Sequence, residues 1–431
     1  MKKIKLDKLW IGIIHMGLGT ILAQMINIIS QPILTRIFSI EILGIYTYLI
    51  SLATVIIPIS SLKLDMLIVS EEDDREAQYI TDVCIIINIL VFISYAFIIF
   101  IGYNFPKENI FNKYGLIIYI VPIIIFTNGL RFLFISYLNR YQKYKTISLI
   151  GVVRESIRVI FQIIGGVFSL GAFILSLGYA ISPLFGLNIQ IKDYLKKLKK
   201  RPKLTKEKFK KIIFEKGRKQ IFFLVPGQFI NSFSSSLVMI YITILFSEKE
   251  LGYYSAGVRV LEIPIIFITS NVSKVCYQKI SENIYKKKPI LKILISVIVV
   301  LSIISIIGFG ILYFIAPKFS EIIFGEGYKI TGEYIKCICI MYAVRLVATS
   351  FSGICILFKK QEFEFILNIL LIIVTIFSYL TCKAFNYSII IYLKYINSGY
   401  TVVYLLLLVG CTILCKNYDD KIKEERLNVI I

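Results

Sequence analysis

Apolar runs long enough to cross a membrane recur from one end of this sequence to the other. They fall near residues 10–30, 42–62, 79–103, 115–138, 146–168, 171–190, 221–246, 251–273, 289–316, 331–357, 361–383 and 388–415. A helix needs about 20 apolar residues to cross the hydrocarbon core of a bilayer. With 57% apolar and only 18% charged residues, a water-soluble domain could not bury these runs. The pattern predicts an all-α integral membrane protein with about 12 transmembrane helices.

Cysteine and histidine residues point to neither a metal centre nor a redox motif. The closest Cys pairs, Cys337 with Cys339 and Cys411 with Cys415, lack the spacing of a CxxC or zinc motif, and His15 is the single His. We therefore expect reduced thiols, no metal and no cofactor, with proton or sodium coupling as the possible energy source.

The distribution of basic residues predicts the orientation in the membrane. The chain carries a net charge of +22, and 34 of its 49 Lys and Arg residues fall in segments on the amino-terminal side of the predicted spans. Basic residues are enriched in cytoplasmic loops. Both termini are therefore predicted to lie in the cytoplasm.

One polybasic segment, residues 192–219, separates six predicted spans from six others. It holds 14 Lys or Arg residues and three acidic ones. Such segments usually set orientation and contact anionic lipid, so we expect anionic membrane lipid, and no nucleic acid, as its partner. We predict an amino-terminal six-helix bundle over residues 1–191, a cytoplasmic linker over 192–219, and a carboxy-terminal six-helix bundle over 220–431.

The two halves resemble each other in sequence. QMINIIS at 24–30 aligns with QFINSFS at 228–234, and LGIY at 43–46 aligns with LGYY at 251–254. Because six crossings return the chain to its starting side, the repeat is predicted to be parallel, with a pseudo-two-fold axis along the membrane normal. Such repeats favour a central site between two bundles that rock against each other.

Five arginines lie well inside predicted spans. Placing one such charge at the bilayer centre costs about 2.5–3.5 kcal/mol, so five facing lipid would cost on the order of 15 kcal/mol. We therefore expect them to face inward and line a cationic cavity. They are Arg131, Arg154, Arg158, Arg259 and Arg345.

Polar side chains at helical spacing form stripes on spans of both halves. Arg154, Arg158 and Gln162 recur at steps of four, which places them on one helix face. Hydrogen bonding between helices is the alternative role for Ser, Thr and Asn in such stripes. The other stripe positions taken as candidate substrate contacts are Gln24, Asn27, Gln228, Asn231 and Lys394.

Two acidic residues lie deep beside the arginines. Glu155 follows Arg154, and Glu262 is one helical turn from Arg259. They are either ion-pair partners or carriers of a coupling proton or cation. Since two acids do not neutralise five cations, the cavity is expected to hold an anion, and the planar fork of Arg suits phosphate.

Four segments resemble a known family: SQPILTRIFS at 30–39, LGIYTYLISL at 43–52, LKLDMLIV at 62–69 and LGYYSAGVRVLEIPI at 251–265. They are similar to bacterial polysaccharide exporters, the Wzx-type O-antigen and capsule repeat-unit flippases of the multidrug/oligosaccharidyl-lipid/polysaccharide exporter superfamily. Where that family usually has an Arg-aromatic-Glu triplet, this chain has Lys63, Leu64 and Asp65. Asp65 is therefore a third candidate for ion coupling.

The resemblance implies a transporter rather than an enzyme. It would move an undecaprenyl-diphosphate-linked oligosaccharide from the cytoplasmic to the outer leaflet of the bacterial inner membrane by alternating access. A polymerase and glycosyltransferases of the same pathway would be its partners.

Three alternatives stay open. A drug exporter of the same superfamily is expected to carry acidic cavity residues, because its usual substrates are cations. A membrane-embedded polysaccharide polymerase or acyltransferase often carries a large outer loop or a catalytic His. A lipid-II-type flippase usually has fourteen spans, two more than are predicted for this chain.

Overall fold

The computed structural model describes residues 2–104, 113–198, 203–358 and 360–430. Side chains are described from Leu18 to Glu424 within these ranges, except at five positions: Asp193, Lys197, Ser270, Asn271 and Lys274. The side chain of His15 and residues 199–202 of the predicted linker therefore lie outside the description. Every regular element in the described part of the chain is helical.

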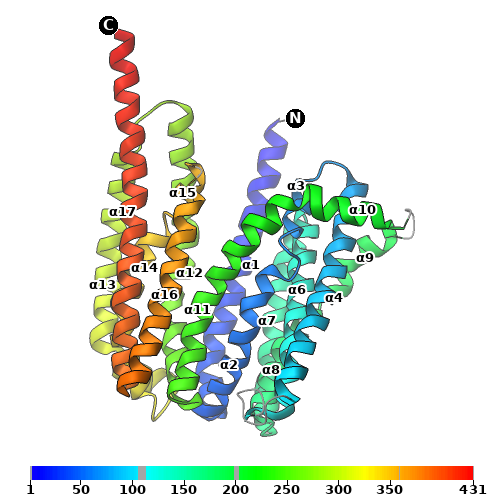
Figure 1. Cartoon of the computed structure of the whole chain (residues 1–431), viewed down its shortest axis with the longest axis vertical. Helices are drawn as coiled ribbons and strands as arrows, with labels where there is room; N and C mark the ends of the chain where they lie inside the picture. Colours follow the sequence, from blue (N-terminus) through cyan, green and yellow to red (C-terminus); the bar gives the residue numbers. More distant parts are fainter. Residues whose placement is uncertain (1, 105–112, 199–202, 359, 431) are drawn as a thin grey trace. The chain divides into compact units, whose positions relative to one another are not determined.

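The helices form two compact units, Met1–Ser236 and Leu237–Ile431, and the division falls inside α11 (Val225–Leu245). Figure 1 shows the helices of each unit. Unit 1 contains α1 (Lys2–Ile37), α2 (Ile40–Ile56), α3 (Asp65–Ser70), α4 (Asp74–Asn104), α6 (Ile120–Arg140), α7 (Tyr144–Val167), α8 (Gly171–Ile181), α9 (Leu187–Leu198) and α10 (Lys206–Lys211). Unit 2 contains α12 (Glu248–Tyr285), α13 (Leu291–Phe324), α14 (Lys329–Thr349), α15 (Gly353–Leu357), α16 (Gln361–Phe385) and α17 (Ile389–Ile430).

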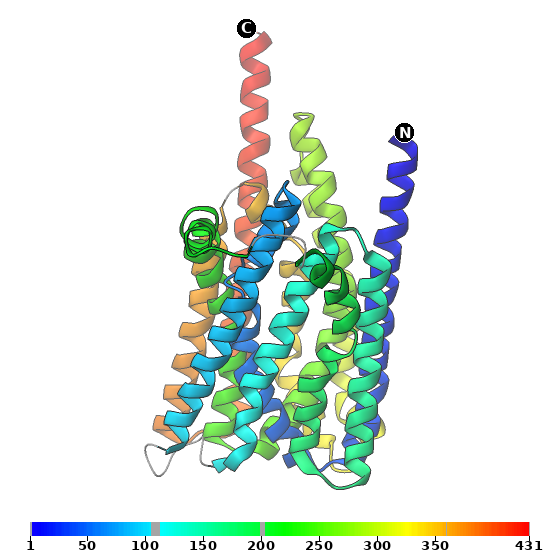
Figure 2. The same cartoon turned by 90° about the vertical axis from the view of Figure 1, so that its right-hand side faces the viewer.

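Short turns of tighter or wider helix continue several of these elements. The tight turns are η1 (Ile57–Ile59), η2 (Gly115–Tyr119) and η3 (Ser182–Leu184). The wide, π-helical turns are η4 (Ile212–Lys216) and η5 (Gln220–Leu224), which lead into α11. Within each unit the long helices run along roughly one direction, as both views show (Figures 1 and 2).

Eleven helical stretches among the described residues are long and apolar enough to cross a membrane. They coincide with eleven of the twelve predicted spans, so the chain is an all-α, multi-pass integral membrane protein. The one remaining predicted span, residues 146–168, forms α7. All of it except Phe168 is helical. It lacks the uninterrupted apolar stretch of the other eleven because Arg154, Glu155 and Arg158 lie near its centre.

Small residues bring α1 and α7 together in unit 1. A Cβ atom on Gly19 would lie 1.8 Å from Ser148 Oγ, and one on Gly166 would lie 2.3 Å from Ile37 Cγ2. Gly19, near the middle of α1, contacts Ser148 near the start of α7, and Ile37 at the end of α1 contacts Gly166 near the end of α7, so the two helices run parallel. In a membrane, small residues allow such close backbone approach without a hydrophobic driving force.

Unit 2 is built around α14, which packs against α12, α13 and α17. The contact with α13 is close because a Cβ atom on Gly332 would lie 2.2 Å from Pro317 Cα. The outer side of α13 exposes large apolar side chains, including Ile306 at 69% and Phe314 at 80%. Such exposure is expected where lipid replaces water as the solvent.

Candidate functional site

A cluster of charged side chains lies on α7, inside unit 1. The Glu155 carboxylate forms ion pairs with both neighbouring arginines: Oε1 with Arg154 Nη2, and Oε2 with Arg158 Nη2 at 2.7 Å. The side chains of Glu155 and Arg158 are only 9% and 11% exposed. The charged groups of this cluster are therefore largely shielded from the solvent or lipid outside the protein.

Helix α1 contributes an amide to this cluster. Arg158 Nη2 donates a 2.9 Å hydrogen bond to Asn27 Oδ1. Gln31 Nε2 donates to the same oxygen at 3.3 Å and so restrains its position. The parallel packing of α1 on α7, permitted by Gly19 and Gly166, brings the amide within reach.

Helices α6 and α8 complete the cluster. Arg131 on α6 interacts electrostatically with Arg154, Glu155 and the hydroxyl group of Tyr179. The ring of Tyr179, on α8, lies 5.9 Å from the Arg158 guanidinium. The structure thus joins Arg131 to the pair on α7, whereas the sequence predicted one cavity for all five arginines without indicating which of them lie together.

The cluster has spare positive charge and spare hydrogen-bond donors. Three arginines face one carboxylate, so two positive charges are uncompensated among the described residues. The Nε–H groups of Arg131 and Arg158 are buried and have no hydrogen-bond partner in the described part of the chain. Buried donors of this kind are costly unless they are paired. An anionic oxygen ligand would satisfy both the charge and the donors.

Unit 2 has a second, looser group around Arg345. Its Nη1 lies 3.7 Å from Glu262 Oε1, and the two side chains are 29% and 39% exposed. The guanidinium lies 5.2 Å from the Tyr342 ring and interacts electrostatically with Tyr254 and Tyr404. Tyrosines, rather than a buried carboxylate, form most of the surroundings of this arginine.

The other two predicted cations of unit 2 lie elsewhere. Arg259, on α12, acts on Tyr328, a residue in the turn before α14. Burial raises the pKa of the Tyr328 hydroxyl, and the charge of Arg259 opposes that rise. Lys394 is exposed on α17 and interacts electrostatically with Cys337. Neither contacts Arg345 through any interaction that the described residues record.

The remaining predicted polar residues differ in their surroundings. Gln24 is half-buried on α1, and Asn231 is exposed on α11. Gln228 Nε2 donates to Ser232 Oγ at 3.4 Å, one turn further along α11. The hydrogen bond of Gln228 lies within its own helix, so it joins no second element.

Asp65 lies in a polar corner where α3 begins. Its Oδ1 accepts a hydrogen bond from Ser61 Oγ at 2.5 Å, and its Oδ2 accepts one from Ser136 Oγ at 3.2 Å. The preceding Lys63 has a φ of +58°, in the left-handed region. Burial lowers the pKa of Lys63, and the charge of Asp65 partly opposes the shift. Both Asp65 oxygens are thus held by hydroxyl groups rather than by an arginine.

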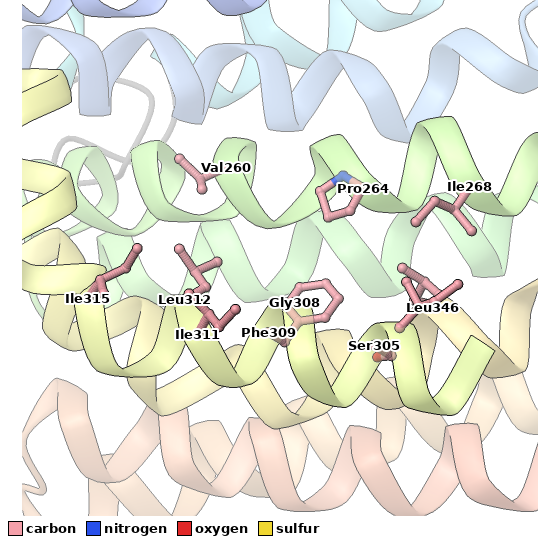
Figure 3. Close-up of a pocket in the computed structure, with 11 residues that line it drawn as sticks. Val260, Pro264, Ile268, Ser305, Gly308, Phe309, Ile311, Leu312, Ile315 and Leu346 are labelled. Atoms are coloured by element: carbon pink, nitrogen blue, oxygen red, sulfur yellow. The ribbon is translucent and has the colours of Figure 1, made fainter. Parts of the chain in front are cut away.

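An apolar groove opens between α12 and α13 in unit 2. It encloses about 340 Å³, and the side chains that line it converge from both helices (Figure 3). Pro264 sits inside α12, where a proline removes a backbone hydrogen bond. A Cβ atom on Gly308 would meet nothing within 4 Å, so the groove is empty at that point. Ser305 Oγ is committed to Ala343 O at 2.7 Å.

The structure places no metal-binding group at these sites. Among the described residues, no three His, Cys, Asp or Glu side chains gather closely enough to hold a metal ion. The eight cysteines are free thiols, and the sulfur atoms of Cys355 and Cys411 lie 3.9 Å apart.

Sequence reasoning missed the tyrosines around both arginine groups. Tyr179 and Tyr404 lie in apolar runs, where an aromatic residue reads as core or lipid contact. Tyr179 is spaced four residues from Leu175, whose carbonyl oxygen accepts a hydrogen bond from the striped residue Gln162. Only the packing of α8 against α7 shows that Tyr179 lies beside the arginines, and no sequence pattern predicts that packing.

Comparison with known families gives one match over most of the chain. A family described as "Polysaccharide biosynthesis protein" matches residues 33–331. No curated protein sequence matches the chain significantly.

Three solved structures with a similar fold are described as a flippase and two transporters. The lipid II flippase MurJ in its inward closed conformation has a TM-score of 0.66 and 13% identity, with 97% of this chain and 92% of that chain covered. An inward-facing multidrug resistance transporter of the MATE family and MOP superfamily has a TM-score of 0.62 and 12% identity, with 94% of each chain covered. A MOP superfamily transporter from Pyrococcus furiosus, described as having a binding pocket of reverse polarity, has a TM-score of 0.60 and 15% identity, with 94% of each chain covered.

Proposed function

The chain belongs to the polysaccharide biosynthesis protein family and has the fold of MOP superfamily transporters, which is not an enzyme fold. From this premise we propose that it is a flippase for an undecaprenyl-diphosphate-linked oligosaccharide. The cargo would be a repeat unit of O-antigen, capsule or a related surface polysaccharide. It would move from the cytoplasmic to the outer leaflet of the bacterial inner membrane.

The excess of buried positive charge in unit 1 carries this proposal. Arg131, Arg154 and Arg158 share one carboxylate, and two of them keep an unpaired Nε–H. A diphosphate offers several anionic oxygens to planar guanidinium donors, which bind phosphate bidentately. A cationic drug would meet repulsion at the same place, so the charge disfavours a drug exporter.

The transport cycle that we propose is alternating access by the two six-helix halves. In unit 1, Arg154 and Arg158 hold the diphosphate, and Asn27 positions Arg158. In unit 2, Arg345 and Arg259 give further contacts. The remaining candidate substrate contacts are Gln24, Gln228 and Asn231 in unit 1 and Lys394 in unit 2. Glu155, Glu262 and Asp65 remain the candidates for proton or sodium coupling.

We propose that the lipid tail stays among membrane lipids while the head group crosses. The groove between α12 and α13 supports this arrangement, because it is apolar and has room for part of the polyprenyl tail. A Leu side chain at Gly308 would fill the groove without touching any arginine, which makes Gly308→Leu a specific test of this detail.

A flipping assay in proteoliposomes tests the proposed function. The purified protein would be reconstituted with a fluorescent lipid-diphosphate oligosaccharide, and a membrane-impermeant quencher would report its movement between leaflets. Wild type and Gly151→Ala should flip the lipid at similar rates, whereas Arg158→Ala should flip it at least about tenfold more slowly. Undiminished flipping by both Arg158→Ala and Arg345→Ala would overturn the charge argument, and export of a cationic dye by the wild type would favour the drug exporter.

A further inference from the structure

The basic segment of unit 1 has two chemically different faces. Residues 206–224, comprising α10, η4 and η5, run across the ends of α4 and α6 before α11 begins (Figure 1). In the view turned by 90° this segment is seen nearly end-on (Figure 2). Its π-helical turns place residues four to five apart on the same side.

The inner face is fully engaged with unit 1. Lys208 Nζ lies 2.7 Å from Glu76 Oε1, while Lys216 Nζ lies 2.7 Å from Glu71 Oε2 and 3.1 Å from Glu76 Oε2. Between these lysines, Ile212 is only 1% exposed and belongs to an apolar core on α3, α4 and α6. Burial lowers the pKa of Lys216, but its hydrogen bonds to the two carboxylates outweigh that effect and raise it. These lysines are not available to an outside ligand.

The outer face alternates basic and aromatic side chains. Lys210, Phe214, Arg218 and Phe222 follow one another at steps of four residues, and all four are exposed. The rings of Phe214 and Phe222 are 66% and 63% exposed. Lys211 and Lys219 flank this row and are exposed as well, with one exposed acid, Glu215, between them. No acid of the 71–76 run forms an ion pair with these basic residues among the contacts that the described residues record.

We propose that this outer face binds anionic phospholipid head groups in the leaflet that meets this end of the spans. Its position supports that partner, since η5 and α11 together form one candidate membrane span, Gln220–Leu245, and the basic residues lie at the start of this span. At such an interface, aromatic rings insert beside the head groups while Lys and Arg attract their phosphates. Each basic residue near an anionic surface contributes about 1 kcal/mol, which corresponds to about a fivefold change in binding.

The alternation of rings and charges favours lipid over other polyanions. Nucleic acid would use the same positive charge. Yet the exposed Phe side chains lie beside a membrane span, where they can insert into the apolar part of the bilayer. Nucleic acid offers no such apolar environment. The surface is also independent of the flippase proposal, because none of its residues belongs to the arginine cluster on α7.

Lipid-specific quenching of tryptophan tests this surface in the full-length protein. Trp10 is the single Trp, so Trp10→Phe gives a background in which Phe222→Trp or Phe214→Trp is the only emitter. These variants would be reconstituted with brominated phosphatidylglycerol or brominated phosphatidylcholine. We expect at least a fivefold preference for quenching by phosphatidylglycerol, lost in high salt. Phe168→Trp, at an uncharged and 70% exposed position, should show no preference and reports correct reconstitution.

Matched charge variants separate the two faces. Lys210→Gln combined with Arg218→Gln should abolish the preference for phosphatidylglycerol. Lys208→Gln with Lys216→Gln removes a similar charge from the inner face and should leave the preference in place. Equal quenching by the two lipids in the unaltered segment would overturn the proposal. So would absence of quenching by either lipid, or equal loss of the preference in both charge variants.

Discussion

The two arginine groups of this protein differ in how tightly their surroundings hold them. In unit 1, Arg158 is 11% exposed, lies 2.7 Å from Glu155 and is bound by Asn27. In unit 2, Arg345 is 29% exposed and lies 3.7 Å from Glu262. A pair at the shorter distance is an ion pair with a fixed geometry, whereas the longer one leaves both partners room to move.

This difference separates a preorganised site from an adaptable one. A rigid cluster with spare donors costs little to reorganise when an anion binds, so it provides affinity. A looser arginine among tyrosines can change partners at low cost. We therefore assign recognition of the diphosphate mainly to unit 1 and a supporting contact to unit 2.

Removing each arginine separately is the strongest way to break this comparison. Arg158→Ala removes charge-assisted hydrogen bonds worth about 1.5–3 kcal/mol, so we expect lipid flipping to fall by about 10- to 150-fold. Arg345→Ala loses a loose, half-exposed pair worth about 1 kcal/mol or less, or about fivefold. Flipping rates in proteoliposomes measure both effects. A larger loss from Arg345→Ala would reverse the assignment of roles.

Disturbing the contact of α1 with α7 tests whether the rigidity of unit 1 matters. The added methyl group in Gly19→Ala would overlap Ser148, so we expect a destabilisation of about 1–3 kcal/mol and weaker binding by Arg158. Thermal unfolding in detergent measures the stability change. Gly151→Ala on α7 is the control, because a Cβ atom there meets nothing within 4 Å. Equal stability of the two variants would contradict the packing described for α1 and α7.

Neutralising each acid sharpens the comparison further. Glu155→Gln frees two largely buried guanidinium groups from their internal anion, so we expect diphosphate to bind about tenfold more tightly. Glu262→Gln should change the affinity by less than about twofold, because its pair with Arg345 is long and partly exposed. Titration calorimetry on both variants gives the answer. Equal changes in affinity for the two variants would show that the lengths of the two Arg–Glu pairs do not determine diphosphate affinity.

Alkaline pH probes whether the tight packing of unit 1 extends to its basic segment. The pKa of Lys216 is raised by Glu71 and Glu76, so its stabilising contribution is complete below the ordinary value of about 10.4 and disappears as pH rises through the higher folded value. Thermal stability of the wild type should therefore fall above about pH 10.4, and the slope should be shallower in Lys216→Gln. The effect should be small, because the side chain is 30% exposed. Parallel curves would argue against this pairing.

Helix positions could be predicted from the sequence because a bilayer imposes one dominant rule. Apolar length located all the long helices, including α7, although α7 carries three charged residues near its centre. Cationic stripes also predicted which face of α7 is polar. The proximity of Arg131 to Arg154 could not be predicted, since it depends on how α6 packs on α7. Nor could the sequence divide residues 206–219 into an inner paired face and an outer exposed one, because both faces are rich in Lys.

Direct binding of a short isoprenoid diphosphate tests the central claim most simply. Citronellyl diphosphate and the alcohol citronellol share one apolar chain and differ only in the anionic group. Calorimetry in detergent should detect binding of the diphosphate but not the alcohol, with affinity reduced at least tenfold by Arg158→Ala. Equal binding of the two compounds, or full affinity in Arg158→Ala, would contradict the account of unit 1 as the diphosphate site.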